Sequence, residues 1–137
     1  MSKPFAVFDL DGTLIRWQLY HAITDALVKA GFADPRAFEP VKEARMQWKR
    51  RASDDAFSEY ERYLIEAFEE ILQNLAPDQL ESVIQAVFEE YKDQVYSYTR
   101  SLISDLKNQG YFLLAISGSQ IEIVSKIADY YGFDDEK

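Results

Sequence analysis

The 137-residue sequence contains no cysteine, so disulfide bonds and thiolate metal sites are excluded. Glycine and proline are scarce, with 5 and 4 residues, which indicates long regular elements joined by short loops. No apolar run approaches the roughly 18 residues that a membrane span needs. Asp9 and Asp11 interrupt the N-terminal apolar segment, so the layout of a signal peptide is absent. We therefore expect a cytoplasmic protein without a membrane partner.

Positive charge is also in short supply. The formal net charge is −9, which argues against a nucleic-acid partner because such binding needs a basic face. An anionic substrate remains compatible, because the local field at a site matters more than the total charge. The length fits one domain, and the 47% hydrophobic content is enough for a core.

Residues 5–15 combine a short apolar run with two acids. Phe5 to Phe8 are apolar, and Asp9 and Asp11 follow directly. A continuous apolar run bounded by turn residues predicts a strand buried on both faces. Ligands of open parallel α/β sheets bind at the C-terminal ends of the strands, where these acids lie. Residues two apart on a strand point to the same side, so both carboxylates can reach one small volume.

The residue types in this stretch favour phosphoryl chemistry. Two close carboxylates repel unless a cation neutralises them, and Mg²⁺ suits a pair of acids completed by water and phosphate oxygens. Gly12 lets the backbone approach an anion with a free N–H, and Thr13 adds a hydroxyl. A carboxylate can also attack phosphorus as a nucleophile. We therefore predict a magnesium and phosphate site at Asp9, Asp11, Gly12 and Thr13.

The remaining pattern divides the chain into a core and an insert. Apolar residues at helical spacing predict helices over about 17–30, 35–51, 55–73 and 77–91, and again over 98–108 and 121–131. A second apolar run over 111–116 predicts a strand parallel to the first. We assign residues 1–16 and 94–137 to an α/β core, and residues 17–93 to an inserted helical cap.

A second polar site follows the second strand. Ser117 and Gly118 come directly after the apolar run and before a helix. A serine hydroxyl with backbone N–H groups at a helix start can seat an anion. The alternative is that Ser117 only caps the helix. Because parallel strands end at the same edge, phosphate binding beside Asp9 is the favoured interpretation.

These motifs resemble those of a known family. Asp9-Leu10-Asp11-Gly12-Thr13 is similar to the first motif of the haloacid dehalogenase-like (HAD) hydrolases, in the DxDGT form of their phosphatases. Residues 113–118 resemble their second motif, and the long helical insert resembles the cap of the phosphoserine-phosphatase-like branch. The resemblance implies an α/β, Rossmannoid parallel-sheet core, incomplete here, with an inserted all-helical cap.

The resemblance also implies roles for individual residues. Asp9 would be the nucleophile and a Mg²⁺ ligand. Asp11 would be the general acid and base, with its backbone carbonyl on the metal. Ser117 would bond the transferring phosphoryl group, helped by the N–H groups of Gly12 and Gly118.

Parts of the family pattern are missing before Lys137. A third-motif lysine and the fourth-motif acids are expected on later elements. Lys126 lies on the wrong element, and Asp134-Asp135 follow no apolar strand. We therefore expect the N-terminal portion of a larger phosphatase, inactive by itself. Two strands make a poor sheet, so the exposed apolar surface should contact the missing C-terminal half or a second copy.

The predicted function is a Mg²⁺-dependent phosphomonoesterase that acts on a small phosphorylated metabolite through an aspartyl-phosphate. The alternative is a non-catalytic phosphate-binding or protein-interaction module. Gln18 stands where phosphoserine phosphatases are expected to carry an acid, which argues against phosphoserine. Candidates for a second anionic group of the substrate are Arg16, Arg45, Arg50, Arg51 and Arg62. The alternative is that the basic run is a solvated helix face. His21 is assigned no role in substrate binding.

Overall fold

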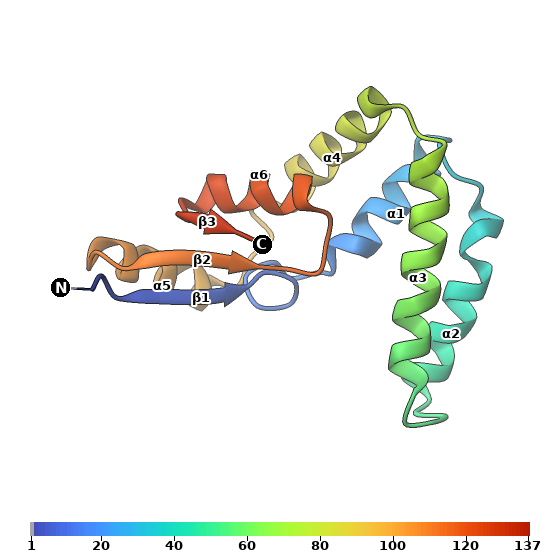
Figure 1. Ribbon diagram of the computed structural model, residues 1–137, viewed down its shortest axis with the longest axis horizontal. Coiled ribbons are helices and arrows are strands. Elements are labelled where there is room, and N and C mark those ends of the chain that lie inside the picture. Colours follow the sequence, from blue (N-terminus) through green and yellow to red (C-terminus); the bar gives the residue numbers. More distant parts are fainter. Residues whose placement is uncertain (1) are drawn as a thin grey trace. The chain divides into compact units, whose positions relative to one another are not determined.

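The structure, a computed structural model, describes residues 2–137 (Figure 1). It divides into two compact units. One comprises the chain up to Ile23 together with Glu81–Lys137, and the other is Thr24–Leu80. The division falls within the helices α1 (Leu19–Lys29) and α4 (Pro77–Tyr91), inside the limits predicted for the insert. That the inserted unit acts as a cap stays a prediction.

The first unit is built on a parallel sheet of three strands. They are β1 (Phe5–Asp9), β2 (Phe112–Ile116) and β3 (Asp135–Glu136), in the order β1-β2-β3. The α/β fold and the two longer strands are as predicted. The prediction of only two strands was wrong. β3 has two charged residues and therefore no apolar pattern, and it forms by backbone pairing with β2.

Two helices connect these strands and cover one face of the sheet. α5 (Ser97–Asn108) packs against β2, and α6 (Ile121–Tyr131) packs against β2 and β3. Right-handed crossovers that step in one direction place both helices on the same face. On that face Phe8, Leu113 and Ala115 are buried. Phe133, just after α6, meets Phe8 edge-on at 5.9 Å between ring centroids.

The other face of the sheet is open to solvent. Phe5 is 69% exposed and Val7 48% exposed, and Phe112 and Ile116 on β2 are also exposed. The register pairs Phe5 with Phe112, so these side chains form one apolar patch. The prediction that β1 is buried on both faces was therefore wrong. The two connecting helices cover one face, and the alternation of side chains along a strand leaves the other set outside.

The second unit is all helical. After α1 it contains a short 3₁₀ helix η1 (Pro35–Phe38), α2 (Glu39–Lys49), α3 (Ala56–Gln73) and the start of α4. The helix predicted over 35–51 is thus two helices. Pro40 explains the break, because it has no N–H to continue the helical hydrogen bonds. α2 packs along α3, where the Trp48 ring stacks on Tyr60 at 5.3 Å. No helix within residues 2–137 is long and apolar enough to cross a lipid bilayer.

Candidate active site

The sheet brings the two predicted motifs to one edge. Asp9 is the last residue of β1 and pairs in register with Ile116, the last residue of β2. The loops that carry Asp11 and Ser117 therefore leave neighbouring strand ends. This confirms the predicted adjacency of the two strand ends, which rested on parallel pairing alone.

The loop after β1 is held by buried apolar side chains and a tight backbone network. Leu10, Leu14 and Ile15 are fully buried. The N–H groups of Leu14 and Ile15 both donate to the Leu10 carbonyl, at 3.0 and 2.9 Å. Gly12 has φ +79°, a conformation that costs other residues energy, so glycine is required at this turn. The loop backbone is thus held by its own hydrogen bonds and by burial of its apolar side chains.

The N–H of Gly12, which was predicted to be free to bind phosphate, is already used within the loop. It donates to the carbonyl of Ile15 at 2.8 Å, which closes the turn. Phosphate binding through this N–H would require that bond to open. The Thr13 hydroxyl instead donates to Asp9 Oδ2 at 2.9 Å and so orients the Asp9 carboxylate, which is solvent-exposed.

Asp11 is the centre of the hydrogen-bond network. Its Oδ1 accepts the N–H of Leu19, the first residue of α1, at 2.6 Å. Its Oδ2 accepts the hydroxyl of Ser117 at 2.5 Å. The structure therefore brings Asp11 and Ser117 together. It also shows that the Ser117 hydroxyl, predicted to face the phosphoryl group, is bonded to Asp11.

Ser119 is a polar residue of this cluster whose side chain the sequence analysis missed. Its hydroxyl lies 3.2 Å from Asp11 Oδ1 and 3.3 Å from Oδ2. Its N–H donates to Ser117 Oγ at 3.0 Å. The signal was present as a second serine two residues after Ser117, but only backbone donors were considered there. Gly118 lies between them and is exposed.

The predicted specificity residues fall in different units. In the first unit, the Arg16 guanidinium lies 5.9 Å from the Tyr96 ring centroid, and the Gln18 side chain lies beside Gly12. In the second unit, Arg62 pairs with Glu66 at 3.0 Å, a hydrogen bond that raises the pKa of Arg62. Arg45, also there, has a buried Nε without a hydrogen-bond partner. A common role for these residues stays a prediction.

Asp9 and Asp11 could hold a magnesium ion together, but no third acid or histidine joins them within residues 2–137. Within residues 2–137 no cluster of three or more histidines or acids could hold a metal. Among the salt bridges of those residues, none involves Asp9 or Asp11. Two carboxylates with hard oxygen donors match a Mg²⁺ shell that substrate and water complete.

The two other charged sites considered in the sequence have structural roles. Lys126 pairs with Glu81 at 3.2 Å. Asp134 Oδ2 accepts the N–H of Leu113 at 2.8 Å, near the start of β2 and away from the strand end that carries Ser117. That Lys126 and Asp134-Asp135 do not supply the missing lysine and acids stays a prediction.

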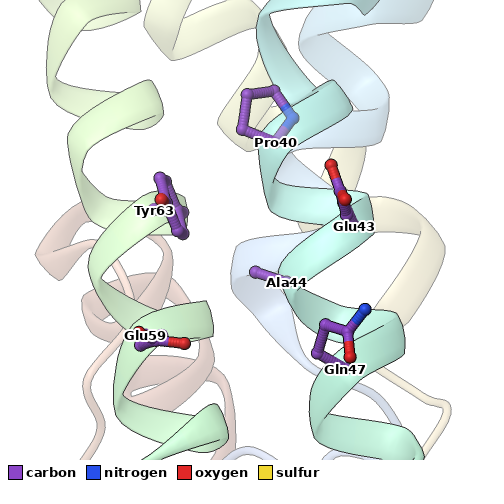
Figure 2. Close-up of a pocket in the computed structure, with 6 residues that line it drawn as sticks. All are labelled: Pro40, Glu43, Ala44, Gln47, Glu59 and Tyr63. Atoms are coloured by element: carbon purple, nitrogen blue, oxygen red, sulfur yellow. The ribbon is translucent and has the colours of Figure 1, made fainter.

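A separate hollow lies between α2 and α3 in the second unit (Figure 2). Its volume is about 260 Å³. The residues that line it are Pro40, Glu43, Ala44, Gln47, Glu59 and Tyr63. The lining has two carboxylates and no lysine or arginine, so this hollow does not fit a phosphate ester.

Comparisons with known proteins agree with this fold. The family model of the haloacid dehalogenase-like hydrolases matches residues 5–137. A protein of unknown function from Bordetella pertussis Tohama I superposes with a TM-score of 0.74 at 14% identity, over 99% of this chain and 60% of its own. A phosphoserine phosphatase, solved as a phospho-aspartyl intermediate analogue, gives 0.58 at 21% identity, over 99% of this chain and 56% of its own. No curated protein sequence matches.

Proposed function

Because the chain belongs to the haloacid dehalogenase-like hydrolase family, we propose that it acts as a Mg²⁺-dependent phosphatase on small phosphorylated metabolites. The observation that carries the proposal is the meeting of Asp9, Asp11 and Ser117 at one edge of the parallel sheet. The chain spans 60% and 56% of the two neighbours above, so the proposal concerns the activity of the whole protein.

Asp9 is the proposed nucleophile. Its carboxylate is exposed to an incoming substrate, and the Thr13 hydroxyl fixes its orientation. An Oδ atom would form a bond to phosphorus while the bond from phosphorus to the ester oxygen breaks. The product of this step is an acyl phosphate on Asp9 and a free alcohol. A carboxylate on a rigid strand end is suited to such an in-line displacement.

Asp11 is the proposed general acid and base. Protonated, it would give its proton to the departing ester oxygen. As a carboxylate it would then take a proton from the water that attacks the acyl phosphate, which releases inorganic phosphate and restores Asp9. The bond from the Leu19 N–H holds its side chain in place for both transfers.

The carboxylate of Asp9 and the backbone carbonyl of Asp11 would hold Mg²⁺, which neutralises negative charge on the phosphoryl group when it is bound. The first turn of α1 adds a partial positive charge, because its N-terminal N–H points at Asp11. The neutral amide of Gln18 beside Gly12 favours a substrate without an amino group at that position.

The second candidate is a non-catalytic phosphate-binding module. The observation in its favour is that no lysine or arginine within residues 2–137 pairs with either acid. Such a module would bind inorganic phosphate without turning over an ester.

Turnover of p-nitrophenyl phosphate with Mg²⁺ by the whole protein separates the two functions. Asp9→Asn removes the nucleophile with little change in shape and should lower the rate by about a thousandfold or more. Asp129→Asn, an exposed acid on α6, is the matched control and should keep the wild-type rate. Equal rates for the wild type and Asp9→Asn would rule out the proposed mechanism.

A further inference from the structure

The hydrogen bond of Ser117 conflicts with its proposed use. A serine hydroxyl has a single hydrogen to donate. In the structure this hydrogen is directed to Asp11 Oδ2 at 2.5 Å. To bond the transferring phosphoryl group, Ser117 must release Asp11 at the step in which Asp11 has to stay in position.

We propose that Ser119 is a positioning residue that holds the Asp11 carboxylate when Ser117 turns its hydroxyl to the substrate. This inference rests on the proposed phosphatase function. The Ser119 hydroxyl already lies 3.2 and 3.3 Å from the two carboxylate oxygens, longer than the Ser117 bond. Release of Oδ2 by Ser117 leaves that oxygen open to the second hydroxyl, which needs only a small movement to reach it.

The backbone supports this exchange of partners. The Ser119 N–H donates to Ser117 Oγ at 3.0 Å and uses a lone pair of that oxygen, so it persists while the Ser117 hydrogen turns. The N–H of Leu19 anchors Oδ1 throughout. Asp11 Oδ1 thus keeps its hydrogen bond from Leu19, while the hydroxyls of Ser117 and Ser119 alternate as donors to Oδ2.

The arrangement predicts that the two serines substitute for each other. Removing either hydroxyl leaves the other on Asp11, whereas removing both leaves only the Leu19 N–H. Neighbouring groups that share a partner give non-additive losses in a double-mutant cycle. The cycle consists of Ser117→Ala, Ser119→Ala and the double variant.

Hydrogen exchange at the Leu19 amide reports on Asp11 without requiring turnover. Leu19 is the first residue of α1, and the first N–H groups of a helix have no hydrogen-bond acceptor within the helix. The bond to Asp11 therefore accounts for the protection of this N–H from exchange. NMR exchange on the 137-residue protein should show increases below about twofold for each single variant and of about tenfold or more for the double, well above the roughly fourfold that additive losses would give. Ser125→Ala removes a similar hydroxyl bond, to Glu136, and should leave the Leu19 rate unchanged.

A threonine variant tests whether faster exchange comes from loss of the hydroxyl or from loss of folding. Ser119→Thr keeps the hydroxyl, so Leu19 in the Ser117→Ala/Ser119→Thr variant should exchange as slowly as in Ser117→Ala alone. With p-nitrophenyl phosphate as substrate, Ser119→Ala should lower kcat about tenfold with little change in KM, and Ser119→Thr should restore it.

Failure of the inference is distinguishable from failure of the proposed function. If the losses in Leu19 protection simply add, Ser119 does not replace Ser117 and the inference is overturned, whether or not the protein turns over. Non-additive losses, together with no turnover by the whole protein, would support the exchange of hydroxyls on Asp11 and count against the phosphatase.

Discussion

The hydroxyl of Thr99 donates to the backbone carbonyl of Thr13 at 2.8 Å, across 86 positions of sequence. Thr99 is buried in the first unit, on α5. The bond ties the loop after β1 to the helix that precedes β2. The loop that carries Asp11 is therefore held both by β1, which precedes it, and by α5.

Removing this tie should destabilise the protein. Thr99→Val keeps the shape of the side chain but leaves the Thr13 carbonyl without this donor, so the free energy of unfolding should fall by about 1–2 kcal/mol. Thr99→Ser keeps the hydroxyl and is the matched control. Urea unfolding followed by circular dichroism measures both. Equal stability for valine and wild type would contradict a structural role for the bond.

The open face of the sheet should cause self-association. The apolar patch of Phe5, Val7, Phe112 and Ile116 is exposed, and β1 is an edge strand. Exposed apolar patches and open edges favour contact with another chain, and charges on them suppress it. We propose that a second copy occupies this face in solution.

Sedimentation velocity over a wide range of concentration tests this prediction. The wild type should associate as concentration rises, and Val7→Lys should remain monomeric. Ile121→Lys, which places the same charge at an exposed position of α6, should associate like the wild type. A wild type that stays monomeric throughout would contradict the proposal.

Alkaline pH should loosen the first unit through Tyr131. Burial raises the pKa of Tyr131 from its ordinary value of 10.0 to about 12, with the charge of Asp93 as the next cause. Its hydroxyl also donates to the Lys92 carbonyl. Because the folded state holds the phenol proton more tightly, this contribution to stability is fully present below pH 10 and is lost as pH rises towards 12.

Urea unfolding at about pH 8 and about pH 11.5 measures this loss. Tyr131→Phe has no proton to lose, so its stability should fall less between the two values than that of the wild type. Some dependence should remain, because the hydrogen bond to Asp93 raises the pKa of Tyr130 as well. An identical fall in both proteins would contradict the role of Tyr131.

Much of the fold could be predicted because the signals were local. The apolar runs before Asp9 and Ser117 gave both longer strands, and helical spacing gave the helices to within a few residues. Two features were missed for physical reasons. β3 has no pattern of its own and depends on β2, and the break at Pro40 comes from one missing N–H within an otherwise helical stretch.

Parallel pairing predicted that Asp9 and Ser117 would lie at neighbouring strand ends, which the register confirms. It did not predict that the Ser117 hydroxyl would bond Asp11. The turn that consumes the Gly12 N–H depends on the carbonyl of Ile15, three residues away, whose position follows from the burial of its side chain. The Ser119 hydroxyl was missed because side-chain direction in a loop is not periodic.

Trapping the covalent intermediate tests whether Asp9 is the nucleophile. Borohydride reduces an acyl phosphate, so the whole protein quenched during turnover of p-nitrophenyl phosphate with Mg²⁺ should yield homoserine in place of Asp9. Peptide mass spectrometry locates the modified residue. We expect homoserine at position 9 alone, absent without substrate and absent in Asp9→Asn. Turnover with no reduction at position 9, or with reduction at Asp11 instead, would contradict it.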